Sequence, residues 1–239
     1  PHSPYPSRMP TRPPTAASLA PFGTTIFTTM TKLAQEHGAV NLSQGFPDFD
    51  GPEFVKEAAI KAMRDGLNQY APMPGVPALR QAIAQRWKIS SGLDVDPDTG
   101  VTVTSGCTEA IAAALMGICD PGDEVILFEP FYDSYRACVA MAGAKACFVT
   151  LRAQADAGKK RHDSPPQTHR GRGETGFTFD EAELHAAFTS KTRAILVNTP
   201  HNPTGKIFTR SELELIAKLC IEHDVIAITD EVYERLTFD

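Results

Sequence analysis

The 239-residue sequence has no run of about 18 apolar residues, so no segment of it is suited to cross a membrane. It has no Cys-x-x-Cys pair. Its five cysteines are odd in number and scattered, which predicts reduced thiols rather than a disulfide framework or a zinc site. Basic residues are outnumbered, and the net charge of -6 argues against a general nucleic-acid surface. We therefore expect a globular protein in the cytoplasm.

Two segments are poor in the residues that build a core. Residues 1–21 carry seven prolines and no acidic residue, which predicts a disordered tail. Residues 152–176 contain no aromatic and no large aliphatic side chain. Their six Lys and Arg residues could suggest RNA contact, but RNA bases would find no aromatic ring to stack on. A disordered surface insertion is the favoured interpretation.

Elsewhere, strand-like and helix-like patterns alternate. Strands are predicted at residues 101–104, 124–128, 146–151, 193–198 and 225–229, and helices at 108–119, 132–141, 180–188 and 211–223. Three further helices are predicted upstream, at 24–37, 52–64 and 76–89. The alternation is typical of βαβ units, so we expect an α/β fold of three αβα layers around a mostly parallel sheet.

Chemically useful side chains follow several of these strands, where open parallel sheets bind their ligands. The Ser105–Thr108 segment opens a helix, whose first backbone N–H groups favour an anion, although a hydroxyl there is more often only a cap. Tyr132 follows the second strand, either as core or as a ring that stacks on a flat ligand. Asp230 ends an apolar strand, where a buried carboxylate needs a partner.

Two partners for Asp230 can be compared. A magnesium ion in a nucleotide site would require a Walker A loop, but Gly205-Lys206 is followed by Ile207 and lacks the first glycine. A cationic ring nitrogen fits better, because a buried carboxylate keeps such a nitrogen protonated. Pyridoxal 5'-phosphate combines that nitrogen with a phosphate, a flat ring and a phenolic oxygen. The sequence therefore predicts this cofactor and no metal.

Five motifs carry a family resemblance. They are Asn41 to Asp48, Tyr70-x-x-x-x-Gly75-x-x-x-Leu79-Arg80, Ser105-Gly106-x-Thr108-Glu109-Ala110, Asn202-Pro203-Thr204-Gly205 and Asp230-Glu231-Val232-Tyr233. Their order and spacing resemble the class I/II aminotransferases, which are fold-type I pyridoxal-phosphate enzymes. The resemblance covers residues 22–151 and 177–239. The segment from Gln44 to Asp48 looks most like the kynurenine/glutamine/methionine branch, because aspartate-type enzymes more often have Glu where Phe46 stands.

The resemblance implies a role for each matching residue. The backbone of Gly106, Cys107 and Thr108 would bind the cofactor phosphate, and Tyr132 would stack on the ring. Asn202 and Tyr233 would hold the phenolic oxygen, and Asp230 the ring nitrogen.

Other implied roles concern the substrate and a second subunit. Gly45 and Asn202 would contact the substrate, an amino acid or a 2-oxo acid. Tyr70 would reach the phosphate of the neighbouring subunit, so a homodimer is expected. No nucleic-acid or membrane partner is expected.

The resemblance also implies a division into domains. Residues 1–21 would be the tail, 22–50 an N-terminal arm and part of a small domain, and 51–239 an incomplete large domain.

Three departures from the family pattern matter. Cys107 replaces a small residue, and a thiol at a helix N-terminus would have a lowered pKa and be open to oxidation. The insertion at 152–176 should loop outward. The family's Schiff-base lysine, in a Ser-x-x-Lys segment, and its substrate arginine lie beyond Asp239. Lys206 is a poor substitute, because that lysine must reach the aldehyde carbon.

The expected function is amino transfer between an amino acid and a 2-oxo acid, with this chain inactive alone. Two alternatives stay open. In the first, the chain is a non-catalytic truncated fragment. In the second, it is part of a related pyridoxal-phosphate-dependent lyase or synthase, such as a cysteine-conjugate β-lyase.

Overall fold

The computed structural model describes residues 15–45, 47, 49–154 and 176–236. They form two compact units. One runs from Gly23 to Ser105, and the other comprises Gly106 onward together with the described residues up to Phe22. Part of the expected tail is ordered, since Ala17–Leu19 form a short 3-10 helix, while residues 1–14 lie outside the described range. The predicted domain boundary at residue 50 stays a prediction.

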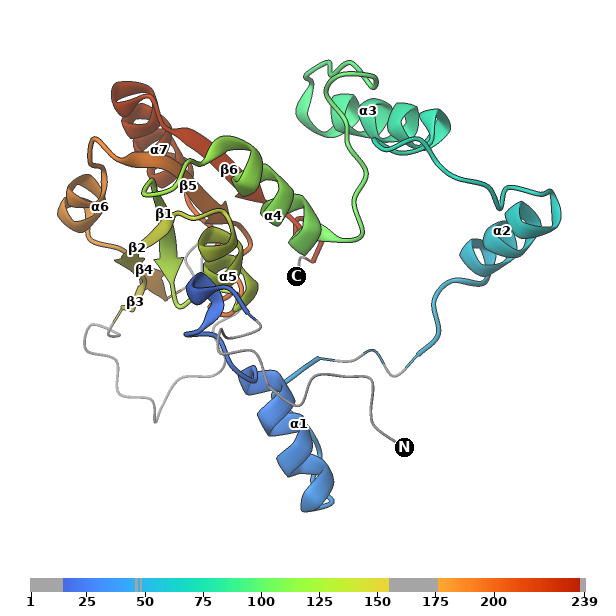
Figure 1. Cartoon of the computed structure of the whole chain (residues 1–239), viewed down its shortest axis with the longest axis horizontal. Coiled ribbons are helices and arrows are strands. Elements are labelled where there is room, and N and C mark those ends of the chain that lie inside the picture. Colours follow the sequence, from blue (N-terminus) through green and yellow to red (C-terminus); the bar gives the residue numbers. More distant parts are fainter. Residues whose placement is uncertain (1–14, 46, 48, 155–175, 237–239) are drawn as a thin grey trace, which may run out of the picture. The chain divides into compact units, whose positions relative to one another are not determined.

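The larger unit is built on a four-stranded sheet (Figure 1). Its strands are β1 (Glu124–Glu129), β2 (Lys145–Thr150), β5 (Thr192–Asn198) and β6 (Ile226–Asp230). They lie in the order β2-β1-β5-β6 and every pair is parallel. Four of the five predicted strands are thus confirmed.

The predicted strand at residues 101–104 is wrong. These residues form no strand, and the Val103 N–H donates to the Pro74 carbonyl within the smaller unit. β-Branched side chains favour an extended backbone, but a strand also needs a neighbouring strand for its hydrogen bonds.

Helices cover both faces of the sheet, and the alternation along β1 shows how. Val125 and Leu127 pack with α4 (Cys107–Ile118) and α5 (Ser134–Met141). Ile126 and Phe128 pack on the opposite face with α6 (Glu181–Ala187) and α7 (Arg210–His223). Because both faces are buried, the strands read as continuous apolar runs. The three-layer αβα architecture predicted from the sequence is confirmed.

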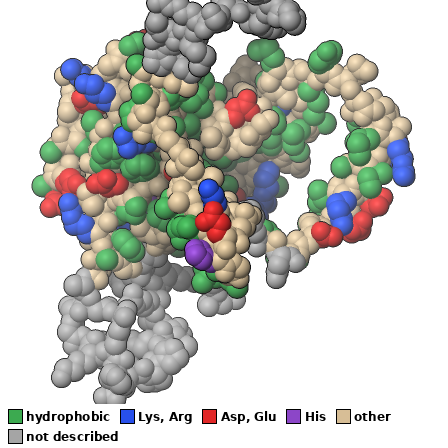
Figure 2. Space-filling model, turned by 60° about the horizontal axis from the view of Figure 1, so that its bottom comes forward, with side chains coloured by type: hydrophobic (Ala, Val, Ile, Leu, Met, Phe, Trp, Pro, Cys, Tyr) green, Lys and Arg blue, Asp and Glu red, His purple; other side chains and the backbone are tan. Residues whose placement is uncertain are grey.

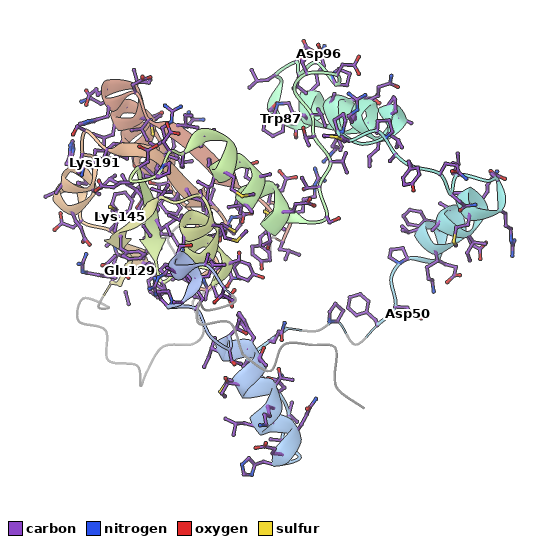
Figure 3. All side chains as sticks on the ribbon, in the orientation of Figure 1. Asp50, Trp87, Asp96, Glu129, Lys145 and Lys191 are labelled. Carbon is purple, nitrogen blue, oxygen red and sulfur yellow. The ribbon has the colours of Figure 1, made fainter. Side chains whose placement is uncertain are left out.

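The strand order creates a switch point in the sheet. From β1 the chain passes through α5 to β2 on one side, whereas β5 and β6 lie on the other side of β1. Ligands of open α/β sheets bind beyond the carboxyl ends of the strands at such a point. Glu129, labelled in Figure 3, is the last residue of β1 and marks this edge, whereas Lys145 begins β2 at the opposite edge.

A small ladder lies at the base of the predicted insertion. β3 (Arg152–Ala153) pairs antiparallel with β4 (Phe177–Thr178). The first two residues of the segment predicted to be disordered are therefore strand, because Phe177, just beyond the segment, packs against the core cluster and brings the two ends together. Residues 155–175 lie outside the described range.

The smaller unit contains α1 (Ile26–Glu36), α2 (Glu53–Arg64) and α3 (Pro77–Ser91), where Trp87 lies (Figure 3). Arg80 on α3 is buried and ties the following loop down: Nε donates to the Gly75 carbonyl at 3.1 Å and Nη1 to Asp98 Oδ1 at 2.8 Å. Gly75 has φ +100°, and a Cβ there would lie 2.5 Å from Val103 Cγ2. The local structure of this loop therefore accounts for the presence of the glycine and the arginine in the Tyr70 motif.

The surface carries interspersed charges. On the face drawn in Figure 2, Lys and Arg side chains lie among Asp and Glu side chains. Several pairs are one helical turn apart, such as Arg210 with Glu214 and Lys218 with Glu222. Exposed pairs of this kind contribute about 0.3–0.5 kcal/mol each, so the core dominates stability. No helix in the described ranges is long and apolar enough to cross a membrane.

Candidate functional site

The candidate site is centred on Asp230, the last residue of β6, which is only 6% exposed. Its Oδ2 accepts a hydrogen bond of 2.5 Å from the Tyr135 hydroxyl, and its Oδ1 accepts one of 3.2 Å from the Val232 N–H. Its backbone carbonyl accepts hydrogen bonds from Asn198 Nδ2 at 3.0 Å and from the Thr199 N–H at 3.1 Å. The end of β6 is therefore held to the end of β5, and the carboxylate has a defined orientation.

Cys107, the first residue of α4, also lies close enough to Asp230 for the carboxylate to act on its thiol. Burial, followed by the Asp230 charge and hydrogen bond, raises the pKa of the Cys107 thiol to about 11. The predicted lowering of this pKa is wrong. A helix N-terminus favours the thiolate, but desolvation and a neighbouring carboxylate both oppose it and outweigh that effect here.

The start of α4 differs from an ordinary capped helix. Its N-cap is Gly106 at φ +90°, a residue without a side chain of its own to form a cap hydrogen bond. The first N–H groups of a helix have no acceptor within the helix. Those of Cys107 and Thr108 lie at this end of α4, and their binding of an anion stays a prediction.

Asn202 and Tyr233 meet across the ends of β5 and β6. Asn202 Nδ2 lies 3.3 Å from Tyr233 Oη and donates to it. The Asn202 backbone N–H donates to Asn198 Oδ1 at 2.7 Å, which fixes the loop after β5. Because Tyr233 accepts from Asn202, its own hydroxyl proton is left to donate to a ligand oxygen.

Tyr132 completes this group. Its ring meets the Tyr135 ring edge-on, with 5.8 Å between the centroids. Burial raises the pKa of Tyr132, and the nearby Asp133, Tyr233, Cys107 and Asp230 raise it further. The structure therefore brings Cys107, Thr108, Tyr132, Asn202, Asp230 and Tyr233 to one edge of the sheet, together with Gly106.

Gly45 and Tyr70 belong to the other compact unit. Tyr70 is fully exposed, and no atom lies within 4 Å of a Cβ built on Gly45. Their roles toward substrate and cofactor stay predictions.

Lys206 is held away from any role as a free amine. Its ammonium group is buried and donates to both Glu212 oxygens, at 2.8 and 3.0 Å, and to the Phe177 carbonyl at 3.1 Å. Glu212 is also the N3 residue of the capping box that starts α7. Lys206 thus joins the loop after β5 to α7 and to β4.

Sequence reasoning missed two buried polar residues at this edge, Tyr135 and Asn198. Tyr135 follows Tyr132 by three residues, so both lie on one side of the helical turn, and that spacing is the only local signal for it. His201 was also missed; it is buried, and burial lowers its pKa to about 4. No group of three or more His, Cys, Asp or Glu suited to a metal occurs within the described residues.

The profile of the family described as "Aminotransferase class I and II" matches residues 37–239. The chain belongs to this family. The enzymes of the family are dependent on pyridoxal phosphate, and the prediction of family and cofactor class from the motifs is confirmed.

Curated relatives of the chain carry several aminotransferase names. The probable N-succinyldiaminopimelate aminotransferase DapC of Mycobacterium tuberculosis is 47% identical over 225 residues, which are 94% of this chain and 52% of the relative. The methionine aminotransferase of Escherichia coli is 40% identical over 93% of this chain and 52% of its own length. Human kynurenine–oxoglutarate transaminase 1 is 42% identical over 87% of this chain and 47% of its own length.

Solved structures agree with the fold. The N-succinyldiaminopimelate aminotransferase of Mycobacterium tuberculosis has a TM-score of 0.80 at 47% identity, covering 94% of this chain and 54% of that one. The methionine aminotransferase of Escherichia coli has a TM-score of 0.78 at 40% identity, covering 94% and 53%. The chain therefore spans about half the length of the relatives that it matches.

Proposed function

We propose that this chain is the cofactor-binding half of a pyridoxal-phosphate-dependent aminotransferase, which transfers an amino group between an amino acid and a 2-oxo acid. The observation that carries the proposal is the environment of Asp230. Its carboxylate is buried, its hydrogen-bond donors, the Tyr135 hydroxyl and the Val232 N–H, are neutral, and no Lys or Arg of the described ranges pairs with it. A cationic ring nitrogen supplies the missing positive charge.

The other groups at this edge match the remaining parts of the cofactor. The first N–H groups of α4, at Cys107 and Thr108, would bind the phosphate. Tyr132 would lie against the ring, and Tyr233, oriented by Asn202, would donate to the phenolic oxygen. When bound, pyridoxal phosphate acts as the electron sink for carbanion chemistry at the substrate Cα. Asp230 strengthens that sink by keeping the ring nitrogen protonated.

Binding of pyridoxamine 5'-phosphate tests this site, because the amine form of the cofactor needs no covalent lysine. Asp230→Asn is expected to weaken binding at least about 10-fold, the value of one charge-assisted hydrogen bond. Glu214→Gln, which removes an exposed carboxylate on α7, is the matched control and should leave the affinity unchanged. Equal affinities for wild type and Asp230→Asn in calorimetric titration would contradict the proposed site.

The reaction itself is tested on the complete gene product. Its coding sequence beyond Asp239 is expected to contain Ser-x-x-Lys. The enzyme should consume an amino acid only when a 2-oxo acid is present. Turnover without an oxo acid would instead indicate a lyase or synthase.

The present chain offers a complementary test. Borohydride treatment with pyridoxal phosphate should leave no stoichiometric adduct on it, because the Lys206 ammonium is buried in an ion pair. An adduct on Lys206 would contradict this expectation.

We also propose that the complete enzyme is a homodimer and cytoplasmic. The exposed Tyr70 side chain supports a contact outside its own unit, and light scattering of the complete protein tests the dimer. The five cysteines are all free thiols, which supports a reducing compartment.

A further inference from the structure

Tyr135 donates a hydrogen bond to Asp230, although it belongs to none of the sequence motifs. It lies on α5 and is 2% exposed, in the core cluster that also contains Leu115, Leu127 and Val139. Its ring is fixed by this packing and by the edge-on contact with Tyr132. Its hydroxyl therefore points in one direction, toward Asp230 Oδ2 at 2.5 Å.

The two oxygens of Asp230 have different partners. Oδ2 is held by the Tyr135 phenol and Oδ1 by the Val232 N–H, at 3.2 Å. The Val232 bond comes from the chain immediately after Asp230, so it cannot by itself fix the carboxylate relative to the rest of the sheet. Tyr135 is 95 residues away in sequence and links the carboxylate to the core.

The phenol is suited to act only as a donor. Burial, followed by the hydrogen bond and the charge of Asp230, raises the pKa of Tyr135, so the hydroxyl keeps its proton at physiological pH. A neutral donor stabilises the buried carboxylate without cancelling its charge, which an Arg or Lys would do. The negative charge is thus left for a ligand.

Resting on the proposed function, we propose that Tyr135 is a positioning residue: its hydrogen bond holds the Asp230 carboxylate oriented for the cationic ring nitrogen of the cofactor. It touches neither the cofactor nor the substrate in this role. Without the bond, the carboxylate would be free to rotate away from that orientation.

The test compares two ligands, pyridoxamine 5'-phosphate and its analogue with CH in place of the ring nitrogen. Wild type is expected to prefer the nitrogen ligand. Tyr135→Phe keeps the packing and removes only the hydroxyl, so it should lose about 10-fold of this preference. Val139→Ala is the matched control from the next turn of α5: it leaves a cavity and lowers the melting temperature, but should keep the preference.

A ligand-free measurement accompanies the titration. Tyrosine ring carbons are isotopically labelled, and the Tyr135 NMR resonance is assigned as the one lost in Tyr135→Phe. This resonance should move in Asp230→Asn, because the acceptor of its hydroxyl changes from a carboxylate to a neutral amide.

The outcomes separate the two proposals. If wild type shows no preference for the nitrogen ligand, the proposed function falls and this inference falls with it. If wild type and Asp230→Asn behave as expected while Tyr135→Phe keeps the full preference, only this inference is overturned. An equal loss in Val139→Ala would also overturn it, because the effect would then come from stability alone.

Discussion

Cys107 offers a sharp test of the electrostatics at the sheet edge, because the sequence and the structure lead to opposite expectations for it. A thiol in the first turn of a helix is usually activated. Here burial and Asp230 raise its pKa to about 11. We therefore expect Cys107 to react slowly with iodoacetamide at pH 8, although part of its surface is exposed.

The size of the effect follows from the thiolate fraction. A rise from 9.0 to about 11 lowers that fraction about 100-fold at pH 8. Solvent screening at a partly exposed group reduces the effect, so alkylation should be about 10- to 100-fold slower than for the same cysteine in the urea-unfolded chain. Asp230→Asn removes two causes of the shift but leaves the largest, burial, so it should speed the reaction only about 3- to 10-fold.

Peptide mass spectrometry measures the rate at each cysteine separately. Cys119 is the internal control: burial and Asp123 raise its pKa, and Asp230 is not among the causes, so its rate should not change in Asp230→Asn. The buried Cys138 and Cys220 report that the variant is still folded. The reasoning is refuted if Cys107 reacts faster in the folded than in the unfolded chain, or if Asp230→Asn leaves its rate unchanged.

Three further predictions concern stability, measured by urea unfolding. Lys206→Met should cost about 3 kcal/mol because it leaves the partly buried Glu212 carboxylate without its cationic partner. Adding Glu212→Gln, which keeps an acceptor for the capping box, should recover most of the loss; a double variant as unstable as the single one would contradict this. Burial lowers the pKa of His201 to about 4 in the folded chain, from 6.5 in the unfolded chain. Between these two pH values the unfolded chain binds more protons, so the free energy of unfolding decreases as the pH is lowered. The loss should be about 2 kcal/mol from pH 7.5 to 5 and be absent in His201→Gln; an unchanged pH dependence in this variant would exclude His201 as its source. Leu184→Ala, at a fully buried site, should lower the free energy of unfolding by about 3 kcal/mol. A loss below about 1 kcal/mol would contradict this, because it would mean that neighbouring side chains move in to fill the cavity.

Much of the fold could be predicted because its signals are local. The helix predicted at 211–223 is α7 within one residue, since Thr209 and Glu212 form a capping box and the apolar spacing follows the helical repeat. Ile216, Leu219 and Cys220 of this helix are buried, whereas Leu213, which also fits the apolar spacing, is exposed. The spacing of apolar residues predicts that a helix forms, but it predicts only approximately which face of that helix is buried.

The failures have a common cause in contacts that no local pattern contains. The segment at 101–104 has the composition of a strand but no strand beside it. The start of the insertion looks disordered, yet Arg152 and Ala153 pair with residues 177 and 178. In both cases the outcome depends on which distant segment supplies or withholds a hydrogen-bonding partner.

By itself, the sequence determined the alternation of strands and helices, the parallel sheet covered on both faces, and the order of motifs that places the chain in its family. These features rest on periodicity and on short-range spacing, which the chain carries whatever its tertiary contacts. Only the tertiary structure decided that Tyr135 holds Asp230, that Lys206 is paired with Glu212, and that Cys107 is a protonated thiol. Burial and charge are properties of neighbours in space, and these neighbours include residues 95 apart along the chain.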